Sequence, residues 1–164
     1  MTPVCGGHLQ ASTSVKHFYS HAKYGDHNYD NKEDCDWVIE APIGKNVHLT
    51  FLTFELEDEH ECGYDSIEVY LGFDDSAQLL GNFCGNRVIQ SVLSLSVIFN
   101  QTNLKYYTYI GDLQVPPEIV STNEVILVRF KSDDTINSKG FSAAYVAIDE
   151  SENEDLPKPS VRYY

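Results

Sequence analysis

The segment FELEDEHECGYD (residues 54–65) joins two stretches in which apolar and polar residues alternate. Val47–Phe54 leads into it and Ser66–Leu71 follows it, and both show the two-residue period of a half-buried β-strand. The stretch therefore predicts two strands connected by a strongly acidic loop. Besides Cys62, this loop carries six carboxylates: Glu55, Glu57, Asp58, Glu59, Glu61 and Asp65.

The same period recurs along most of the chain. Asp36–Ala41, Glu124–Lys131 and Phe141–Ile148 also alternate or are rich in β-branched and aromatic residues, and no convincing helix appears. Turn residues such as Pro42 and Gly44 separate the predicted strands. Many short strands with one buried face each predict an all-β fold, an antiparallel β-sandwich.

Length and charge limit the classes of function. The chain has 164 residues, 42% of them hydrophobic, which fits one globular domain. Its net charge of -14 argues against nucleic acid and favours cationic partners or divalent metals. No apolar run approaches the roughly 18 residues of a membrane span. The first residues show no signal peptide, so we expect either a piece of a longer secreted chain or a cytosolic domain.

Four widely spaced cysteines help to decide between these two origins. They lack a C-x-x-C pair and a histidine at zinc-finger spacing, so two disulfides explain them better than a zinc site or four unpaired core thiols. Three pairings are open, and we favour the sequential one because it makes two short loops that flank strand pairs. Disulfides indicate an oxidising compartment. The sequential pairs are Cys5–Cys35 and Cys62–Cys84.

The acidic loop is a candidate site for a hard cation. Calcium takes about six to eight oxygen ligands, and clustered carboxylates supply them. The alternative is a solvated acidic loop without a ligand. A second acidic pair, Asp133 and Asp134, follows another predicted strand and favours the metal.

No enzyme motif accompanies the acidic loop. The zinc-protease pattern H-E-x-x-H is absent; His17 and His21 have its spacing but lack its glutamate, and we interpret them as surface histidines. Nucleophile-elbow, phosphate-loop and dinucleotide-binding glycine patterns are also absent. Nothing suggests a sugar cleft beside the carboxylates. We therefore predict a non-catalytic binding module.

Several stretches together resemble the CUB domain family, and most of all the C-terminal CUB module of tolloid-like astacin metalloproteases. The resemblance covers residues 5–148 with one interruption. It implies a jelly-roll β-sandwich with the sequential disulfides. The stretches are CGGHLQ (5–10), SHAKYGDHNYDNKEDCDWVI (20–39), FELEDEHECGYDSIEVYLG (54–72), LGNFCG (80–85) and FKSDDTINSKGFSAAY (130–145).

The resemblance to calcium-binding CUB domains implies a Ca²⁺ site. Glu57, Asp65 and Asp133 match its carboxylate ligands. Thr135 is expected to add its backbone carbonyl, and Asn137 to act through water. Tyr29 matches a tyrosine that orients the acids by hydrogen bonding. The remaining carboxylates of the loop have no such match and are interpreted as solvated.

The resemblance also implies a function. The ligand acids Glu57, Asp65 and Asp133 would accept a lysine or arginine of an extracellular substrate or matrix protein. The chain would then be a calcium-dependent substrate-recognition module from a secreted, tolloid-like metalloprotease, with no nucleic acid and no membrane insertion. Two alternatives stay open: a free-standing secreted CUB protein that binds matrix or basic ligands, and a calcium-independent CUB domain.

One stretch departs from the CUB pattern. Asn86–Ile110 contains no acid and is rich in Val, Leu, Ile, Ser and Tyr. It is either a genuine apolar insertion or translated non-coding sequence, and the abrupt change of composition favours the second. The sequon at Asn100 predicts glycosylation only in the first case. Around the domain, we expect a linker at 1–4 and a disordered acidic tail at 149–164.

Overall fold

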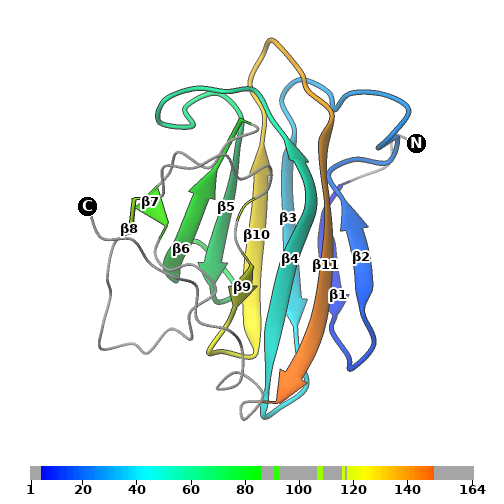
Figure 1. The fold of residues 1–164 in the computed structure, drawn as a ribbon, viewed down its shortest axis with the longest axis vertical. Coiled ribbons are helices and arrows are strands. Elements are labelled where there is room, and N and C mark those ends of the chain that lie inside the picture. Colours follow the sequence, from blue (N-terminus) through cyan, green and yellow to red (C-terminus); the bar gives the residue numbers. More distant parts are fainter. Residues whose placement is uncertain (1–4, 86–90, 93–106, 109–115, 117, 150–164) are drawn as a thin grey trace.

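The computed structural model describes residues 5–85, 91–92, 107–108, 116 and 118–149. Its strands form two main sheets that face each other across a hydrophobic core (Figure 1). The first sheet contains, in spatial order, β1 (Gly7–Gln10), β3 (Asp34–Glu40), β10 (Val125–Lys131), β5 (Ser66–Leu71) and β6 (Gln78–Phe83). The second contains β2 (Lys16–Tyr19), β11 (Gly140–Asp149), β4 (Lys45–Glu55) and β9 (Ile119–Val120). A separate pair joins β7 (Ser91–Val92) to β8 (Tyr107–Thr108).

The predicted β-sandwich is confirmed, with one difference in strand direction. Every ladder is antiparallel except the one between β1 and β3, which is parallel. Parallel neighbours need a crossover connection. Here the chain leaves β1, forms β2 in the opposite sheet, and only then returns as β3 beside β1.

The strands found by periodicity lie where the sequence predicts them. Ser66–Leu71 matches β5 residue for residue, and the other predicted strands differ from the observed ones by one or two residues at an end. Periodicity missed β1, β2, β6 and β9, which all lie at sheet edges. β1, β2 and β9 have only two to four residues, so few alternations are available to reveal them. β6 has six residues, but Gly81 and Asn82, which are rare in strands, interrupt its pattern. The described residues contain no helix.

Phe141 lies at the centre of the core. It is fully buried, and its ring lies 5.5 Å from Phe51, 5.6 Å from Trp37, 5.8 Å from Phe18 and 5.9 Å from Phe130, measured between ring centroids. Most of these pairs are edge-to-face, a geometry that adds about 0.5–1.5 kcal/mol to the effect of burial alone. One residue of β11 therefore joins β2, β3, β4 and β10, strands from both sheets.

Two disulfides close the loops around this core. Cys5 pairs with Cys35 and Cys62 with Cys84, the sequential pairing expected from the sequence. The first bond fastens the start of β1 to β3. The second fastens the acidic loop to the end of β6, so that its position depends on the sheet.

Two glycines allow close approaches at the edge of the sandwich. Gly6 has a φ of +86°, and a Cβ there would lie 2.5 Å from the carbonyl oxygen of Asp36. Gly140 has a φ of +91°, and its Cβ would lie 2.1 Å from Ser20 Oγ. Both positions require the left-handed backbone and the missing side chain of glycine. They bring β1 against β3 and the end of β2 against the start of β11.

The remaining predictions on domain limits stay untested. β11 includes Asp149, one residue beyond the predicted end of the domain. Residues 1–4 and 150–164, and Asn100, lie outside the described residues. Within 86–110 only β7 and the two residues of β8 are described, so the origin of that segment stays a prediction.

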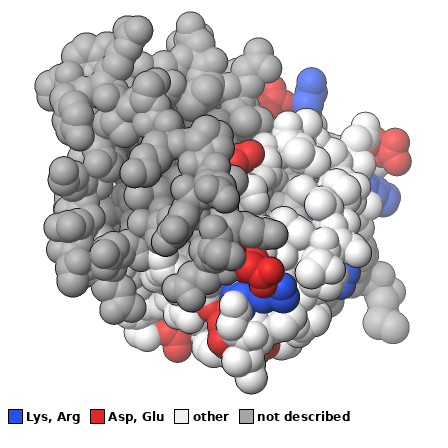
Figure 2. Space-filling model, turned by 60° about the horizontal axis from the view of Figure 1, so that its bottom comes forward, with Lys and Arg blue, Asp and Glu red and all other residues white. Residues whose placement is uncertain are grey.

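Charges of both signs occur at the end of the sandwich where β3 runs into β4. Figure 2 shows acidic and basic side chains beside each other on the described part of this face. One pair there is Lys45 with Asp149, with 2.5 Å between Nζ and Oδ1. Among the described residues, no helix is long and apolar enough to cross a membrane.

We predict that Phe141→Ala lowers the free energy of unfolding by about 3–5 kcal/mol, because it removes a ring at the junction of five aromatic neighbours. Urea denaturation followed by Trp37 fluorescence measures this. Ile43→Ala is the control, because Ile43 is 93% exposed and its truncation leaves no cavity. Equal losses in both variants would contradict the central role of Phe141.

Candidate metal centre

Three loops meet at one end of the sandwich, the upper end in Figure 1. They are residues 20–33 between β2 and β3, 56–65 between β4 and β5, and 132–139 between β10 and β11. The loops meet there because β4 and β10 both end at this side of the molecule. The acidic stretch and the Asp133–Asp134 pair, distant in sequence, thereby become neighbours.

Glu57, Asp65 and Asp133 converge in this loop cluster. One carboxylate oxygen from each lies within 4.8 Å of the others. Asp65 is fully buried and Glu57 is 8% exposed, whereas Asp133 is partly exposed. The cluster therefore has a closed inner side made by two acids and an outer side where Asp133 meets solvent.

The hydroxyl of Tyr29 connects two of these acids. It donates a hydrogen bond to Asp65 Oδ2 and accepts one from the backbone N–H of Glu57 at 3.1 Å. The other oxygen of Asp65 accepts the backbone N–H of Asp133 at 2.9 Å. The Tyr29 ring is buried and packs edge-to-face on Phe130, 5.1 Å between centroids. Packing in the core thus fixes the position of the Tyr29 hydroxyl. The hydroxyl in turn holds Glu57 and Asp65 at the two ends of the loop 56–65.

Burial shifts the acid–base equilibria of the cluster. It raises the pKa of Glu57, and the charges of Asp133 and Asp65 raise it further. Burial also raises the pKa of Asp65, although the hydrogen bonds from Tyr29 and the Asp133 amide oppose this. Desolvation, followed by the hydrogen bond to Asp65, raises the pKa of Tyr29, so this side chain is a neutral donor at physiological pH. Ionisation of all three acids is therefore opposed by desolvation and by charge repulsion, and a bound cation would offset both.

Two buried side-chain oxygens in these loops, one of them in the cluster, have no hydrogen-bond partner among the described residues. They are Glu57 Oε2 and Asn137 Oδ1. A buried carboxylate oxygen left without a donor is costly, and such groups usually coordinate an ion or water. The donor set is entirely oxygen, which suits calcium rather than zinc. These residues therefore fit a Ca²⁺ ion.

The loop that carries Asn137 is held in an unusual shape. Its neighbour Ile136 has a φ of +43°, a region that β-branched residues rarely adopt. Lys32 and Cys62, in the other two loops, also have positive φ. All the non-glycine residues with positive φ that the described chain contains therefore lie in these three loops. Such strain concentrates at ligand sites.

Backbone contacts to 132–139 come from residues that the sequence did not single out. Asn28 Nδ2 donates to the Asn137 carbonyl at 3.1 Å, and Lys32 N–H donates to the Asp133 carbonyl at 2.9 Å. Thr135 is exposed, and its N–H donates to Asp133 Oδ1 at 3.1 Å. Asn28 could have been found from the sequence because it precedes Tyr29, a predicted site residue. Hydrophobic periodicity does not reveal it, since it lies in a loop.

The other acids of 56–65 do not join the cluster. Glu59 accepts the N–H groups of Glu61 and Gly63 at 3.0 and 2.7 Å, and these bonds lower its pKa. It shapes the loop, a role that the interpretation as a merely solvated acid missed. Asp58 and Glu61 are exposed.

A second group of acid and sulfur atoms lies elsewhere, at Cys5, Glu33 and Cys35. Its two cysteines form a disulfide, so they offer no thiolate to a metal. Glu33 is partly buried beside this bond, and its pKa is raised by burial and by the nearby Asp30. We assign this group no metal.

Comparison with known protein families identifies the family to which this domain belongs. The sequence profile of the CUB domain matches residues 5–109, so the chain belongs to the CUB domain family. CUB domains are non-catalytic protein-interaction modules, which confirms the prediction that this chain is not an enzyme.

Its relatives include tolloid-like proteins. Tolloid-like protein 2 of Homo sapiens is 43% identical over 143 residues, which cover 87% of this chain and 11% of that protein. The chain thus spans about a tenth of the length of this relative.

Solved structures agree on the fold. The extracellular region of zebrafish Gpr126/Adgrg6 matches with a TM-score of 0.62 and 28% identity, covering 90% of this chain and 15% of that one. The MASP-1 CUB2 domain bound to Ca²⁺ matches with a TM-score of 0.56 and 22% identity, covering 87% of this chain and 99% of that one. At this identity the second likeness concerns the fold alone.

We predict that Tyr29→Phe lowers the free energy of unfolding by about 1–3 kcal/mol, because it deprives the buried Asp65 of a donor and the Glu57 amide of an acceptor. Chemical denaturation in the presence of a chelator measures this. Tyr145→Phe is a matched control: Tyr145 is also buried, and its hydroxyl has no hydrogen-bond partner among the described residues. If Tyr29→Phe lowers the free energy of unfolding no more than Tyr145→Phe does, the hydrogen bonds of the Tyr29 hydroxyl do not stabilise the loops.

Proposed function

We propose that this CUB domain binds Ca²⁺ through Glu57, Asp65 and Asp133, and that the calcium-loaded loops recognise a lysine or arginine of an extracellular partner protein. The observation that carries the proposal is the buried Glu57 Oε2, which has no partner among the described residues and lies beside two further carboxylates. Thr135 and Asn137 complete the oxygen set, and Tyr29 supports it.

The proposed role of the ion is to hold the two acidic loops together, and it takes part in no reaction. Three like charges at this distance repel each other, and the raised pKa values of Glu57 and Asp65 express that cost together with burial. Calcium offsets the repulsion and fastens 56–65 to 132–139. Tyr29 holds Asp65 from the inner side, so the acids keep their positions when a partner approaches.

The outer side of the cluster suits a basic side chain. Asp133 is partly exposed, and the same two loops carry the exposed acids Asp58, Glu61 and Asp134. Carboxylate oxygens that remain free beside the ion accept charge-assisted hydrogen bonds from an ammonium or guanidinium group. The surplus acids add long-range attraction, which speeds association and makes it sensitive to salt.

The likeness to tolloid-like proteins extends the proposal to the parent chain. At 43% identity with Tolloid-like protein 2, this domain fits a module of a secreted tolloid-like metalloprotease, where it would supply substrate recognition to a separate catalytic domain. Two disulfides suit an oxidising, extracellular location.

We predict that Ca²⁺ raises the melting temperature of the domain and that Asp65→Ala abolishes the rise. At a calcium concentration 100 times the dissociation constant, binding adds about 2.7 kcal/mol to the stability of the folded state. Differential scanning calorimetry with calcium and with chelator measures the shift, and isothermal titration calorimetry gives the stoichiometry.

Asp58→Ala is the control for this calcium experiment. Asp58 is exposed and lies in the same acidic loop, but it is not part of the convergent cluster. It should keep most of the calcium-dependent rise. Equal effects of Asp58→Ala and Asp65→Ala would mean diffuse attraction of cations instead of a defined site.

We further predict calcium-dependent binding of a basic probe. Surface plasmon resonance with the immobilised 164-residue chain and a peptide of neutral residues around one lysine should show binding in calcium. Chelator or Asp133→Ala should weaken it by about tenfold or more, because an interfacial charge pair loses its partner. Higher salt should mainly slow association.

A peptide with acetyl-lysine in place of lysine is the control for charge recognition. It should fail to bind even in calcium. Binding that is unchanged in chelator, or indifferent to Asp133→Ala, would place the partner on another surface of the domain while leaving calcium binding intact.

A further inference from the structure

The sandwich has an open flank where neither sheet has a further strand. β1 is the edge of one sheet and β2 the edge of the other, and they lie on the same side of the molecule (Figure 1). At one end the gap between them is bridged, because Lys16 Nζ donates to the carbonyl of Gln10 at 2.9 Å. At the other end the gap widens into a cavity.

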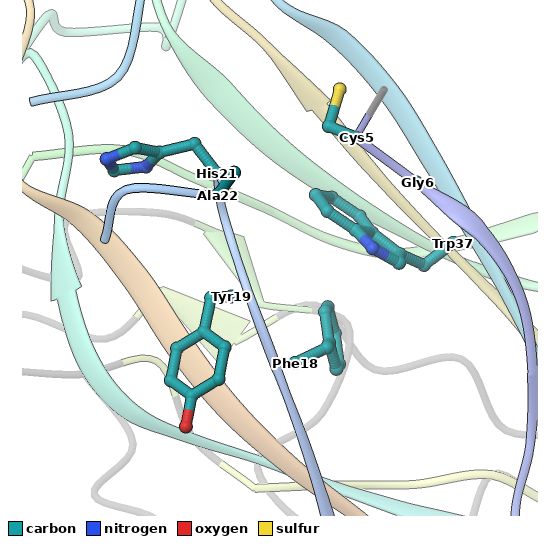
Figure 3. A pocket seen from close by; sticks show the side chains of 7 residues that line it. All are labelled: Cys5, Gly6, Phe18, Tyr19, His21, Ala22 and Trp37. Carbon is teal, nitrogen blue, oxygen red and sulfur yellow. The ribbon is translucent and has the colours of Figure 1, made fainter. Parts of the chain in front are cut away.

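This cavity has a volume of about 250 Å³ and is lined by aromatic and small residues. Trp37 and Phe18 contact each other, 5.2 Å between ring centroids, and both are largely buried. Figure 3 shows Cys5 and Trp37 on one wall and Tyr19 and His21 on the other. A cavity of about 150 Å³ is enough to hold a benzene ring. The flank therefore has room for an aromatic side chain.

The wall on the β2 side is fixed by hydrogen bonds. His21 Nε2 donates to the carbonyl of His27 at 2.6 Å, and its Nδ1 lies 2.7 Å from Ser20 Oγ. The same Ser20 oxygen accepts the backbone N–H of Phe141 at 3.1 Å. Ser20 thus anchors this wall of the cavity to the core strand β11.

Beside the cavity, β2 offers unpaired backbone groups. Ser20 N–H donates to the Phe141 carbonyl at 3.0 Å, and Tyr19 is in register with Ser142. In an antiparallel ladder, alternate residues bond to the neighbour and the others point away. The backbone groups of His17 and Tyr19 therefore face outward, and no described strand pairs with them. Such an edge is a template for an added strand.

The segment that contains β1 and β2 differs in charge from the chain as a whole. Residues 5–25 contain Lys16, Lys23 and three histidines but no carboxylate, in a protein of net charge -14. Of the acids in β3, Glu40 pairs with one of these histidines, His8, at 2.8 Å, and Asp36 contacts Arg129 at 2.8 Å on the outer face. Glu33 lies beside the cavity residue Cys5, 3.5 Å between Oε2 and Sγ, and is partly buried. Along the edge of β2 itself the charged or basic side chains are Lys16 and His17, and complementarity there favours acidic side chains in an added strand.

We propose that the open flank binds an extended, acidic segment of a partner protein, which adds as a strand to the free edge of β2 and inserts one aromatic side chain into the cavity that Phe18 and Trp37 line. Side chains of a strand added to β2 alternate between the two faces of the sheet. The side chains on the inner face of the added strand would point toward the cavity beside Trp37. The site differs from the calcium cluster in residues and in the sign of its charge.

The test uses the ¹⁵N-labelled 164-residue chain and a peptide of alternating glutamate and threonine with one central tryptophan. Nuclear magnetic resonance should show saturable shifts, centred on the amides of His17 and Tyr19, with slower hydrogen exchange at both. Replacing the tryptophan of the peptide with serine should weaken binding by about tenfold or more, since a buried aromatic anchor dominates such interfaces. Lysine in place of glutamate should have a similar effect.

Two protein variants separate the cavity from the strand edge. Ala22→Trp fills the mouth of the cavity from an exposed position and should weaken binding by about tenfold. His17→Pro removes an outward N–H without removing a ladder bond, and should weaken it too. Ile43→Trp adds the same bulk at a 93% exposed turn and should change nothing. Asp133→Ala should leave binding of the acidic peptide intact, whatever its effect on calcium.

Several results would overturn the proposal. One is the absence of saturable binding up to about 1 mM peptide. Another is binding that survives Ala22→Trp or the loss of the tryptophan of the peptide. A sulfated oligosaccharide that binds the flank more tightly than the peptide, with shifts confined to Lys16 and Lys23, would assign it to anionic glycans instead.

Discussion

The packing of aromatic rings around Phe141 is the constraint on which the rest of this structure depends. Rings from β2, β3, β4 and β10 contact this side chain, so the two sheets are joined at one point in the middle of the core. In one direction the contacts continue through Phe130 to Tyr29, whose hydroxyl holds Asp65. In the other they continue through Phe18 and Trp37 to the open flank. Both candidate binding surfaces are extensions of one core.

The cluster of Glu57, Asp65 and Asp133 shows how a buried framework can hold like charges close together. Loops alone would move apart to separate three carboxylates. Here Cys62–Cys84 fastens one loop to β6, and the Tyr29 hydroxyl and the Asp133 amide hold Asp65. The acids therefore stay close, at the cost of raised pKa values and a buried oxygen without a donor. A site that is strained in this way gains affinity for the ion that relieves it.

Two surfaces of opposite charge can serve one recognition module. The acidic loops are proposed to bind basic side chains, whereas the strands and loop beside the cavity of the flank carry Lys16, Lys23 and three histidines. His21 contacts the ring of Tyr29, 6.3 Å between centroids, so the two surfaces are neighbours. A partner with both a basic side chain and an acidic extended segment would engage them together, and the second contact would benefit from the effective concentration set by the first.

The sequence by itself determined the class of fold and singled out the three carboxylates that converge in the structure. Two-residue periodicity located the long strands, because a half-buried strand must alternate. Cysteine spacing favoured the observed disulfides, and the resemblance to CUB domains selected Glu57, Asp65 and Asp133 from a larger set of acids. Only the tertiary structure decided which of these carboxylates are buried, since burial depends on how three distant loops pack. It alone revealed the short edge strands, the role of Glu59 in its loop and the cavity on the flank, because each arises from contacts between residues that no local pattern connects.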